Sequence, residues 1–316
     1  MMTRREFILS TAAATALGPR FSAYASEEIA SIPAIDTHTH FYDPTRPEGV
    51  PWPPKDNPLL YIPRYPKDFR TEASPHNVVG TVVVEASDWV EDNAWILELA
   101  ETNDDIVGLI GNLEPGKPEF AGHLKRFSAN PLFLGLRLRG AINNHLGEDR
   151  VLADIKRLAD LDQTLDIHGG ARMLAPTLMI AGKFPSLRIV VNHLPFGDWD
   201  GNVPEMRRAL AELTRHPNVY MKVSAVVRRL KGEVVVDPEF YRPGLDALYE
   251  LFGPDRLVYG SNWPVSDQIA PYTNVRGVMN DYLATRSRSD AEKYFWRNSL
   301  VAYRWIPRGA AAKLVR

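Results

Sequence analysis

Apolar runs alternate with amphipathic segments along most of the chain, from about residue 33 to residue 284. Several of these runs, such as VVGTVVVEA and LRIVVNH, are continuously apolar, which is typical of parallel strands covered on both faces. The pattern predicts eight strands, at residues 33–40, 78–86, 106–113, 133–139, 164–169, 187–194, 219–225 and 256–262.

Helical periodicity fills the gaps between the strands. In DRVLADIKRLADLD and NVPEMRRALAELTRHP the apolar residues fall on one helical face. Strands separated by helices over this length predict a single-domain α/β fold, a (β/α)8 TIM barrel. The runner-up is a doubly wound open sheet, but the chain contains no GxGxxG or P-loop motif to support it.

Residues 44–75 interrupt this alternation of strands and helices, since they contain nine prolines and show little periodicity. The segment follows the first strand, so in a barrel it would partly cover the catalytic face. Trp52, Tyr61 and Tyr65 could then contact a substrate, although an ordinary packing role fits them equally well.

The first 25 residues have the features of an export signal. Arg4 and Arg5 form a twin-arginine pair, an apolar stretch runs from Phe7 to Leu17, and an A-x-A-like site precedes Ser26. The apolar stretch is shorter than the ~20 residues that span a bilayer. We therefore expect a twin-arginine signal at 1–25, a barrel at 26–316, and a periplasmic or otherwise exported protein without a membrane anchor after cleavage.

Charge and cysteine content narrow the possible functions. The formal net charge is −2 and the chain has no cysteine. Nucleic acid is therefore an unexpected partner, and thiol nucleophiles and thiolate ligands are excluded. We expect a small molecule as the substrate, whereas the sequence does not indicate the oligomeric state.

Histidines fall at the ends of several predicted strands, where a barrel carries its catalytic groups. His38 and His40 are two residues apart on the first strand and share a face with Asp36. His168 and His193 end the apolar strands TLDIH and RIVVNH. A lone histidine there is more often a hydrogen-bonded core residue, but four at three strand ends favour a functional cluster, such as a metal site.

The motifs IDTHTHFYDP, LDIHGG, VVNHLPFGDW, NVYMKVSAV and LVYGSNWPV occur in an order that resembles the amidohydrolase superfamily. The chain is most similar to its amidohydrolase-2 branch, which includes sugar-lactone and pyrone-dicarboxylate lactonases and metal-dependent decarboxylases. The resemblance implies a distorted barrel with the active site at the carboxyl-terminal ends of the strands.

In that family the residues corresponding to His38, His40 and His168 bind a divalent metal, which implies one metal here, zinc being the first candidate. The resemblance also implies that His193 contacts the metal, the substrate or the attacking water. The fourth strand, LGLRLRG, has no lysine at its end, so a binuclear site built on a carbamylated lysine is not expected.

Asn262 in GSNWP stands where the resemblance predicts an aspartate that binds the metal or acts as the base. An amide cannot take a proton at neutral pH. The base would then be Glu85, Asp267 or His193, unless a zinc-bound water ionises without one. Deamidation of Asn262 would also restore the acid, and a further alternative is that the protein does not catalyse hydrolysis. The protein could also work without a metal.

Cationic and aromatic residues at strand ends are candidates for substrate binding. Arg137 and Arg139 share one face of the fourth strand and could hold a carboxylate of the substrate or pair with Glu85. Lys222 could stabilise an oxyanion or form a salt bridge in the barrel mouth. Together with Arg137 and Lys222, Trp263 is expected to orient the substrate.

These observations predict a hydrolase of a small molecule, namely a lactonase that opens a sugar-derived or carboxylated lactone. Two alternatives stay open. One is a metal-dependent decarboxylase on the same scaffold. The other is a binding protein without turnover, which the amide at Asn262 favours and the retained histidines oppose.

Overall fold

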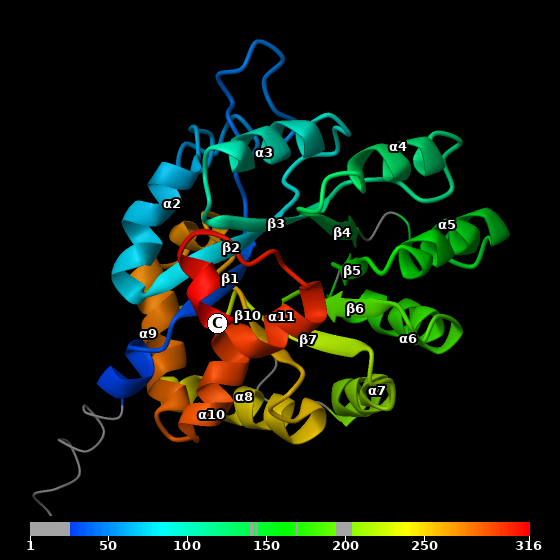
Figure 1. Cartoon of the computed structure of the whole chain (residues 1–316). Helices are drawn as coiled ribbons and strands as arrows, with labels where there is room; N and C mark the ends of the chain where they lie inside the picture. Colours follow the sequence, from blue (N-terminus) through cyan, green and yellow to red (C-terminus); the bar gives the residue numbers. More distant parts are fainter. Residues whose placement is uncertain (1–25, 140–141, 143–144, 169, 194–203) are drawn as a thin grey trace, which may run out of the picture.

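The computed structural model describes residues 26–139, 142, 145–168, 170–193 and 204–316. Eight parallel strands form one sheet in the order β1-β2-β3-β4-β5-β6-β7-β10 (Figure 1). They are β1 (Ala34–Thr39), β2 (Val78–Val84), β3 (Ile106–Gly111), β4 (Phe133–Leu138), β5 (Thr164–Ile167), β6 (Arg188–Val191), β7 (Val219–Val223) and β10 (Leu257–Tyr259). Each strand lies within a range that the sequence pattern predicts.

The sheet closes on itself beyond the end of β10. Thr39 pairs with Trp263 in a parallel bridge, and the Asn262 amide donates a hydrogen bond to the His38 carbonyl at 2.9 Å. The predicted TIM-barrel-like α/β fold in a single domain is therefore confirmed, and the doubly wound sheet is not found.

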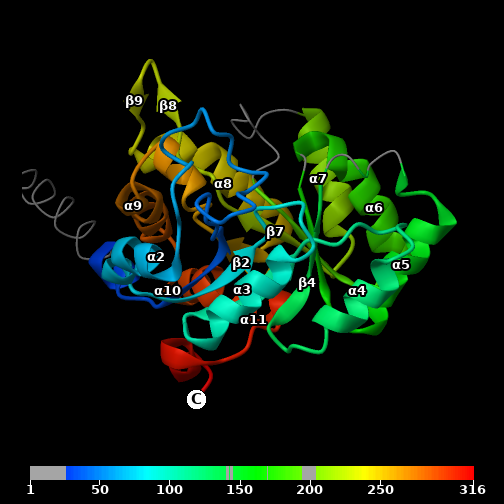
Figure 2. The same ribbon diagram turned by 90° about the horizontal axis from the view of Figure 1, so that it is seen from above.

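Helices surround the barrel (Figures 1 and 2). They are α2 (Pro66–Ala73), α3 (Asp92–Glu101), α4 (Phe120–Phe127), α5 (Asp149–Asp160), α6 (Leu174–Lys183), α7 (Pro204–Thr214), α8 (Pro238–Phe252), α9 (Tyr272–Leu283), α10 (Arg288–Glu292) and α11 (Asn298–Tyr303). Shorter helical segments lie at Ser74–His76, Gly170–Met173, Val265–Gln268, Lys293–Arg297 and Gly309–Leu314. The amphipathic faces predicted for α5 and α7 are the faces that they bury.

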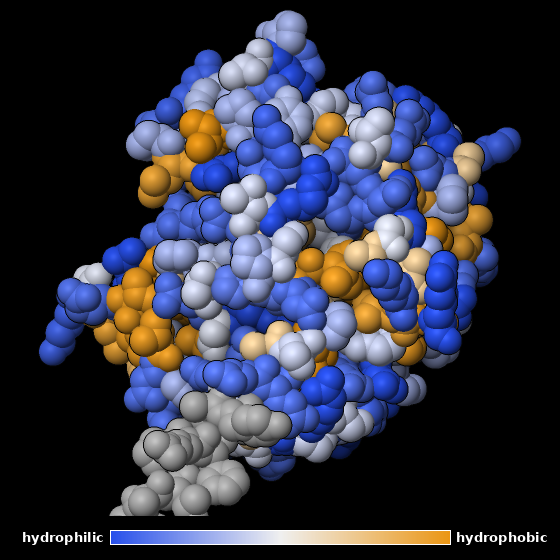
Figure 3. Space-filling view, turned by 60° about the vertical axis from the view of Figure 1, so that its left-hand side comes forward, coloured by the Kyte–Doolittle hydropathy of each residue, from blue (hydrophilic) through white to orange (hydrophobic). Residues whose placement is uncertain are grey.

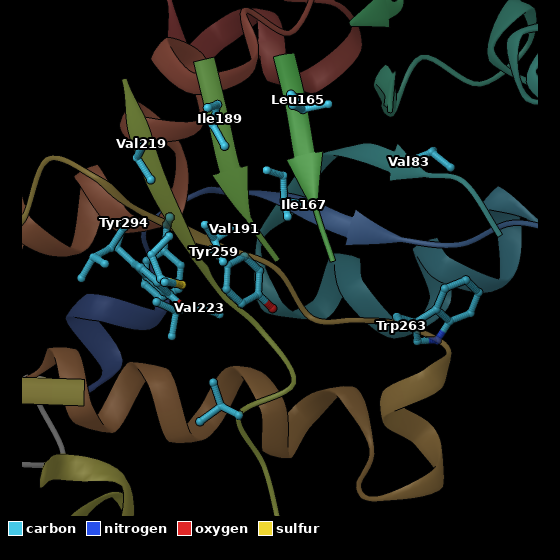
Figure 4. Packing of buried hydrophobic residues seen from close by; sticks show 14 of the residues in the cluster. Val83, Leu165, Ile167, Ile189, Val191, Val219, Val223, Tyr259, Trp263 and Tyr294 are labelled. Atoms are coloured by element: carbon cyan, nitrogen blue, oxygen red, sulfur yellow. The ribbon is translucent and has the colours of Figure 1, made fainter. Parts of the chain in front are cut away.

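Alternation along the strands divides the core into two layers. In β2, Val83 belongs to the apolar layer between strands and helices, whereas Val82 and Val84 belong to a second cluster that fills the barrel. Figure 4 shows part of the outer layer, with Leu165 and Ile189 on neighbouring strands. This two-sided burial explains why the strands read as continuous apolar runs.

The C-terminal segment closes the end of the barrel at which the strands begin. Tyr303 and Trp305 are buried in the inner cluster, and the Ile306 amide donates to the Val107 carbonyl at 2.9 Å. Figure 2 shows the C-terminus at the opposite end of the molecule from the hairpin of β8 (Arg229–Leu230) and β9 (Glu233–Val234). One end of the barrel is thus plugged, which leaves the other end for a ligand.

The proline-rich segment lies over that other end, as the sequence predicts. Tyr42 and Arg64 pair through their backbones at its two sides, and the Trp52 ring lies 5.7 Å from the His40 ring, centroid to centroid. Trp52 therefore covers the first histidine pair. Tyr65 donates a hydrogen bond to Asp43 and packs on Trp95, which is a structural role.

The face seen in Figure 3 is mainly hydrophilic, and its hydrophobic residues gather in separate patches. No helix among the described residues combines the length and the hydrophobicity that crossing a membrane requires. Residues 1–25, which carry the expected export signal, lie outside the described residues.

Candidate active site

A cavity of about 410 Å³ opens at the carboxyl-terminal ends of the strands. Its polar wall combines imidazole, guanidinium and amide groups from five strands, as expected for a catalytic face. These groups belong to His40, Arg137, Arg139, His168, His193 and Asn262. The structure thus brings together six of the residues that the sequence singles out.

The four strand-end histidines form one cluster. Ring centroids are 5.0 Å apart for His38 and His40, 4.4 Å for His38 and His193, and 5.2 Å for His168 and His193. Burial lowers the pKa of His40 to about 3 and that of His168 to about 4, with a further contribution from Arg137. Burial also holds the pKa values of His38 and His193 well below the usual value. All four rings are therefore neutral at pH 7.

Hydrogen bonds fix the orientation of the rings. His40 Nδ1 lies 2.9 Å from the Val84 carbonyl oxygen, which can only accept, so Nδ1 carries the proton of the neutral ring. His193 Nδ1 pairs with Ser224 Oγ at 2.9 Å. In both rings Nε2 is the nitrogen left for a ligand.

The donor set suits a divalent metal in its chemistry, since neutral imidazoles are the usual nitrogen ligands. His38 Nε2 and His168 Nδ1 are buried without a hydrogen-bond partner in the described part of the chain. However, no group of three or more His, Asp or Glu side chains among the described residues stands in an arrangement that could hold a metal ion. The assignment of His38, His40 and His168 as ligands remains a prediction.

Glu85 lies behind the guanidinium groups. Its carboxylate is buried and accepts hydrogen bonds from Arg137 Nε at 2.6 Å and Arg139 Nε at 2.7 Å, and it forms a further ion pair with Arg139 Nη2. Arg139 also pairs with Asp88. The lone pairs of Glu85 are therefore directed at two cations, and its visible role is to position them.

Lys222 and Trp263 are not among the residues that line the cavity. Lys222 is fully buried and donates hydrogen bonds to Asp166 Oδ2 and the Thr37 carbonyl, each at 2.8 Å. Trp263 is fully buried against Phe41 and Phe69. The structure thus places Lys222 in the salt bridge that the sequence offered as the alternative, and Trp263 in the core.

Asp36 does not share the face of His38 and His40. The pairing of β1 with β2 shifts register between Asp36 and Thr39, so strict alternation fails at this point. Asp36 instead accepts hydrogen bonds from the Tyr272 hydroxyl of α9 and the Ser261 amide. Burial raises its pKa, and these bonds oppose the rise.

Three residues of the cavity wall have a strained backbone. The φ angles of His193, Ala225 and Asn262 are +63°, +53° and +68°, in the left-handed region that non-glycine residues rarely adopt. Such residues cost on the order of 1–3 kcal/mol each and concentrate at functional sites. Ala225 carries no chemical signal in the sequence, so sequence reasoning could not find it.

Asp267, offered by the sequence as another base, does not line the cavity. Its carboxylate lies 3.8 Å from Arg64, and burial raises its pKa to about 6. Sequence reasoning missed Asp166, although an acid inside the apolar strand LDIH signals a buried partner.

A parallel barrel with a polar, histidine-lined cavity at the carboxyl ends of its strands is the arrangement of an α/β-barrel enzyme. Residues 35–305 match the amidohydrolase family model, and the chain belongs to this family. The family predicted from the motifs is therefore confirmed.

Two similar relatives are named L-fucono-1,5-lactonase. The one from Burkholderia ambifaria is 29% identical over 240 residues, which are 73% of this chain and 80% of the relative. The one from Burkholderia multivorans is 24% identical over 302 residues, 89% of this chain and 98% of the relative. A solved amidohydrolase from B. multivorans with bound zinc superposes with a TM-score of 0.77 at 22% identity, over 86% of this chain and 99% of that one.

The predicted reaction class, a hydrolase of the lactonase type, is confirmed by these relatives.

Proposed function

We propose that this protein opens a small lactone by adding water across the ring ester. The observation that carries this proposal is the placement of a neutral, buried imidazole, His193, in the same cavity wall as the Arg137 guanidinium. One group can take a proton, and the other can stabilise negative charge on a carbonyl oxygen. The lactonase names of the two relatives support the choice of substrate class.

In the proposed reaction Arg137 binds the lactone carbonyl. Its Nε and Nη2 are held by Glu85, and Nη1 has no hydrogen-bond partner in the described part of the chain. Nη1 is therefore available to the carbonyl oxygen. Because Glu85 holds the guanidinium before the substrate arrives, little reorganisation is needed as charge develops.

His193 transfers the proton of the attacking water to the ring oxygen of the lactone. Water attacks the carbonyl carbon while His193 Nε2 takes its proton, and the carbonyl oxygen becomes an oxyanion against Arg137. When the oxyanion collapses, the bond to the ring oxygen breaks, and that oxygen takes the proton back from His193. The product is a hydroxy acid. The hydrogen bond to Ser224 keeps Nδ1 occupied, so Nε2 is the nitrogen that accepts and returns the proton.

We also propose one divalent metal, with zinc as the first candidate, held by His38, His40 and His168. When bound, it would polarise the carbonyl and ease the ionisation of water. Elemental mass spectrometry of protein purified without added metal or chelator tests this. About one metal per chain, lost in a His38→Ala/His40→Ala variant, supports the proposal. No metal in either sample leaves a metal-independent lactonase.

Lactonase activity is tested by acid release from a panel of aldono-1,4- and aldono-1,5-lactones, with spontaneous hydrolysis subtracted. The proposal predicts acceleration that His193→Asn abolishes. Carbon dioxide release from carboxylated rings would point to a decarboxylase instead. Binding of lactones without any turnover would point to a binding protein. Either result contradicts the proposal.

We further propose export by the twin-arginine route, supported by Arg4, Arg5 and the apolar stretch that follows. Cell fractionation should find the protein outside the cytoplasm, and an Arg4→Lys/Arg5→Lys variant should accumulate inside. Equal distribution of the two proteins would contradict this proposal.

A further inference from the structure

A second cavity, of about 430 Å³, adjoins the candidate active site. We call it the side pocket. It lies between residues 225–229, which follow β7, and residues 261–269, which follow β10, and it reaches Val275 of α9. The two cavities have Ala225, Asn262 and Val265 in common as wall residues. These three residues therefore lie where the two cavities adjoin.

The two cavities differ in chemistry. Three imidazole and two guanidinium groups line the active site. The side pocket has the polar wall residues Arg228, Arg229, Ser261, Asn262, Ser266 and Gln268, and it is distinguished by five aliphatic side chains. These are Val226, Val227, Val265, Ile269 and Val275. An apolar group gains free energy in proportion to the area that such walls remove from water. A hydroxyl placed against them would lose its hydrogen bonds to water without replacement.

Ser266 is one of the polar residues in the wall of the side pocket. Ser266 is 7% exposed, and its Oγ has no hydrogen-bond partner in the described part of the chain. A buried hydroxyl without a partner is costly, and a single polar atom of a ligand would remove that cost. The aliphatic residues are thus one part of a wall that also carries polar groups, among them the Ser266 hydroxyl.

We propose that the substrate is a lactone whose ring carries an apolar substituent, and that the side pocket binds this substituent. The ester carbonyl would lie in the active site and the substituent would pass Asn262 and Val265. This inference rests on the proposed lactonase function. A fully hydroxylated lactone would use only the active-site cavity, whose volume is of the order of a small-molecule site by itself.

The test is a series of δ-lactones with methyl, propyl, pentyl and heptyl groups on the carbon next to the ring oxygen. Each methylene buried in the side pocket should raise kcat/KM about fourfold, which is the factor for ~0.8 kcal/mol, until the pocket is full. A kcat/KM that stays constant or falls along the series would overturn the inference while leaving the lactonase proposal intact.

Binding gives a readout that does not need turnover. The matching δ-lactams, which resist ring opening, should bind with a Kd that falls about fourfold per methylene in calorimetry. If no lactone is opened but the Kd of the lactams falls with chain length, the proposed reaction is wrong and the assignment of the side pocket is supported. If lactones are opened and the Kd of the lactams does not depend on chain length, the inference that the side pocket binds the substituent is wrong.

A pair of variants locates the effect. Ile269→Asn places an amide in the wall and should flatten the dependence on chain length. The matched control, Val301→Asn, changes an exposed position on α11 and should keep that dependence. Equal dependence in both variants would overturn the assignment. The wild-type lactam series decides the question if Ile269→Asn does not fold.

Discussion

Replacing Lys222 by methionine separates a structural role from a substrate-binding role. Lys222 and its partner Asp166 both have fully buried side chains, and their Nζ–Oδ2 distance is 2.8 Å. Tyr303 donates a second hydrogen bond to Asp166 at 2.9 Å. Methionine keeps the length of the side chain and removes its charge, so the carboxylate of Asp166 is left with neutral partners only.

The expected cost follows from the burial of the pair. Breaking a buried ion pair by removing one partner typically costs about 3–5 kcal/mol, because the remaining charge stays uncompensated in a medium of low polarity. At an m-value of about 1–3 kcal/mol per molar urea, the midpoint of unfolding would fall by at least ~1 M. Adding Asp166→Asn to the variant removes the orphaned charge and should restore part of this loss.

The assay is urea unfolding followed by tryptophan fluorescence, with kcat/KM measured on the same preparations. The structural reading predicts a lower midpoint for Lys222→Met and partial recovery in the double variant. An unchanged midpoint together with a large fall in kcat/KM would refute this reading. Lys222 would then act on the substrate, as one reading of the sequence suggested.

Three further variants test the cavity and its surroundings. His193→Asn, which tolerates the positive φ of this position, should lower kcat about 10²- to 10⁴-fold and leave the unfolding midpoint nearly unchanged. Arg137→Lys loses the fork that contacts Glu85, and steady-state kinetics should show a kcat/KM about tenfold lower. Burial raises the pKa of Asp267 from 3.8 to about 6, so the folded state binds the proton more tightly and stability falls as pH rises through that window. Asp267→Asn should therefore be more stable than the parent protein at pH 7, by about 1 kcal/mol once solvent screening is allowed for, and equal below about pH 4 in thermal unfolding.

The strands could be predicted from the sequence because burial on both faces requires a continuous run of apolar residues. A parallel strand between a helix layer and a barrel interior needs apolar residues at successive positions, as in Val82, Val83 and Val84. The polar residues that follow such a run then mark the catalytic end. His168 and His193 could be assigned to the site because they recur at strand ends together with His38 and His40.

Side-chain direction and pairing could not be predicted in the same way. Asp36 turns toward α9 because the register of β1 shifts, and no residue type in IDTHTH signals that shift. Lys222 pairs with Asp166 across the barrel, 56 residues away in sequence, which a strand-end pattern cannot distinguish from a substrate contact. The side pocket depends on segments after β7 and β10 that meet only in the folded chain.

The amide at Asn262 has a physical explanation in the state of His40. His40 donates its Nδ1 proton to the Val84 carbonyl, so Nε2 of the neutral ring can only accept a hydrogen bond. The side chain of Asn262 acts to raise the pKa of His40, but burial of the ring outweighs this effect. A contact that raises this pKa is one in which the amide oxygen faces an N–H of the protonated ring, and a carboxylate would have the same effect more strongly. Asparagine is therefore compatible with a neutral His40, whereas the aspartate expected from the family would favour the imidazolium.

Asn262→Asp should accordingly change the protonation of His40 and the affinity of the site for metal. A carboxylate beside the ring should raise the pKa of His40 by about 1 to 3, because an opposite charge stabilises the imidazolium, and NMR titration of the histidine rings measures this. The added carboxylate should also raise the zinc content after dialysis against the metal, since it supplies a further ligand. Asn57→Asp, whose amide pairs with Gln268, is the matched control and should change neither quantity. If His40 titrates identically in the parent and in Asn262→Asp, the amide does not set the state of that ring, and another constraint must account for asparagine at this position.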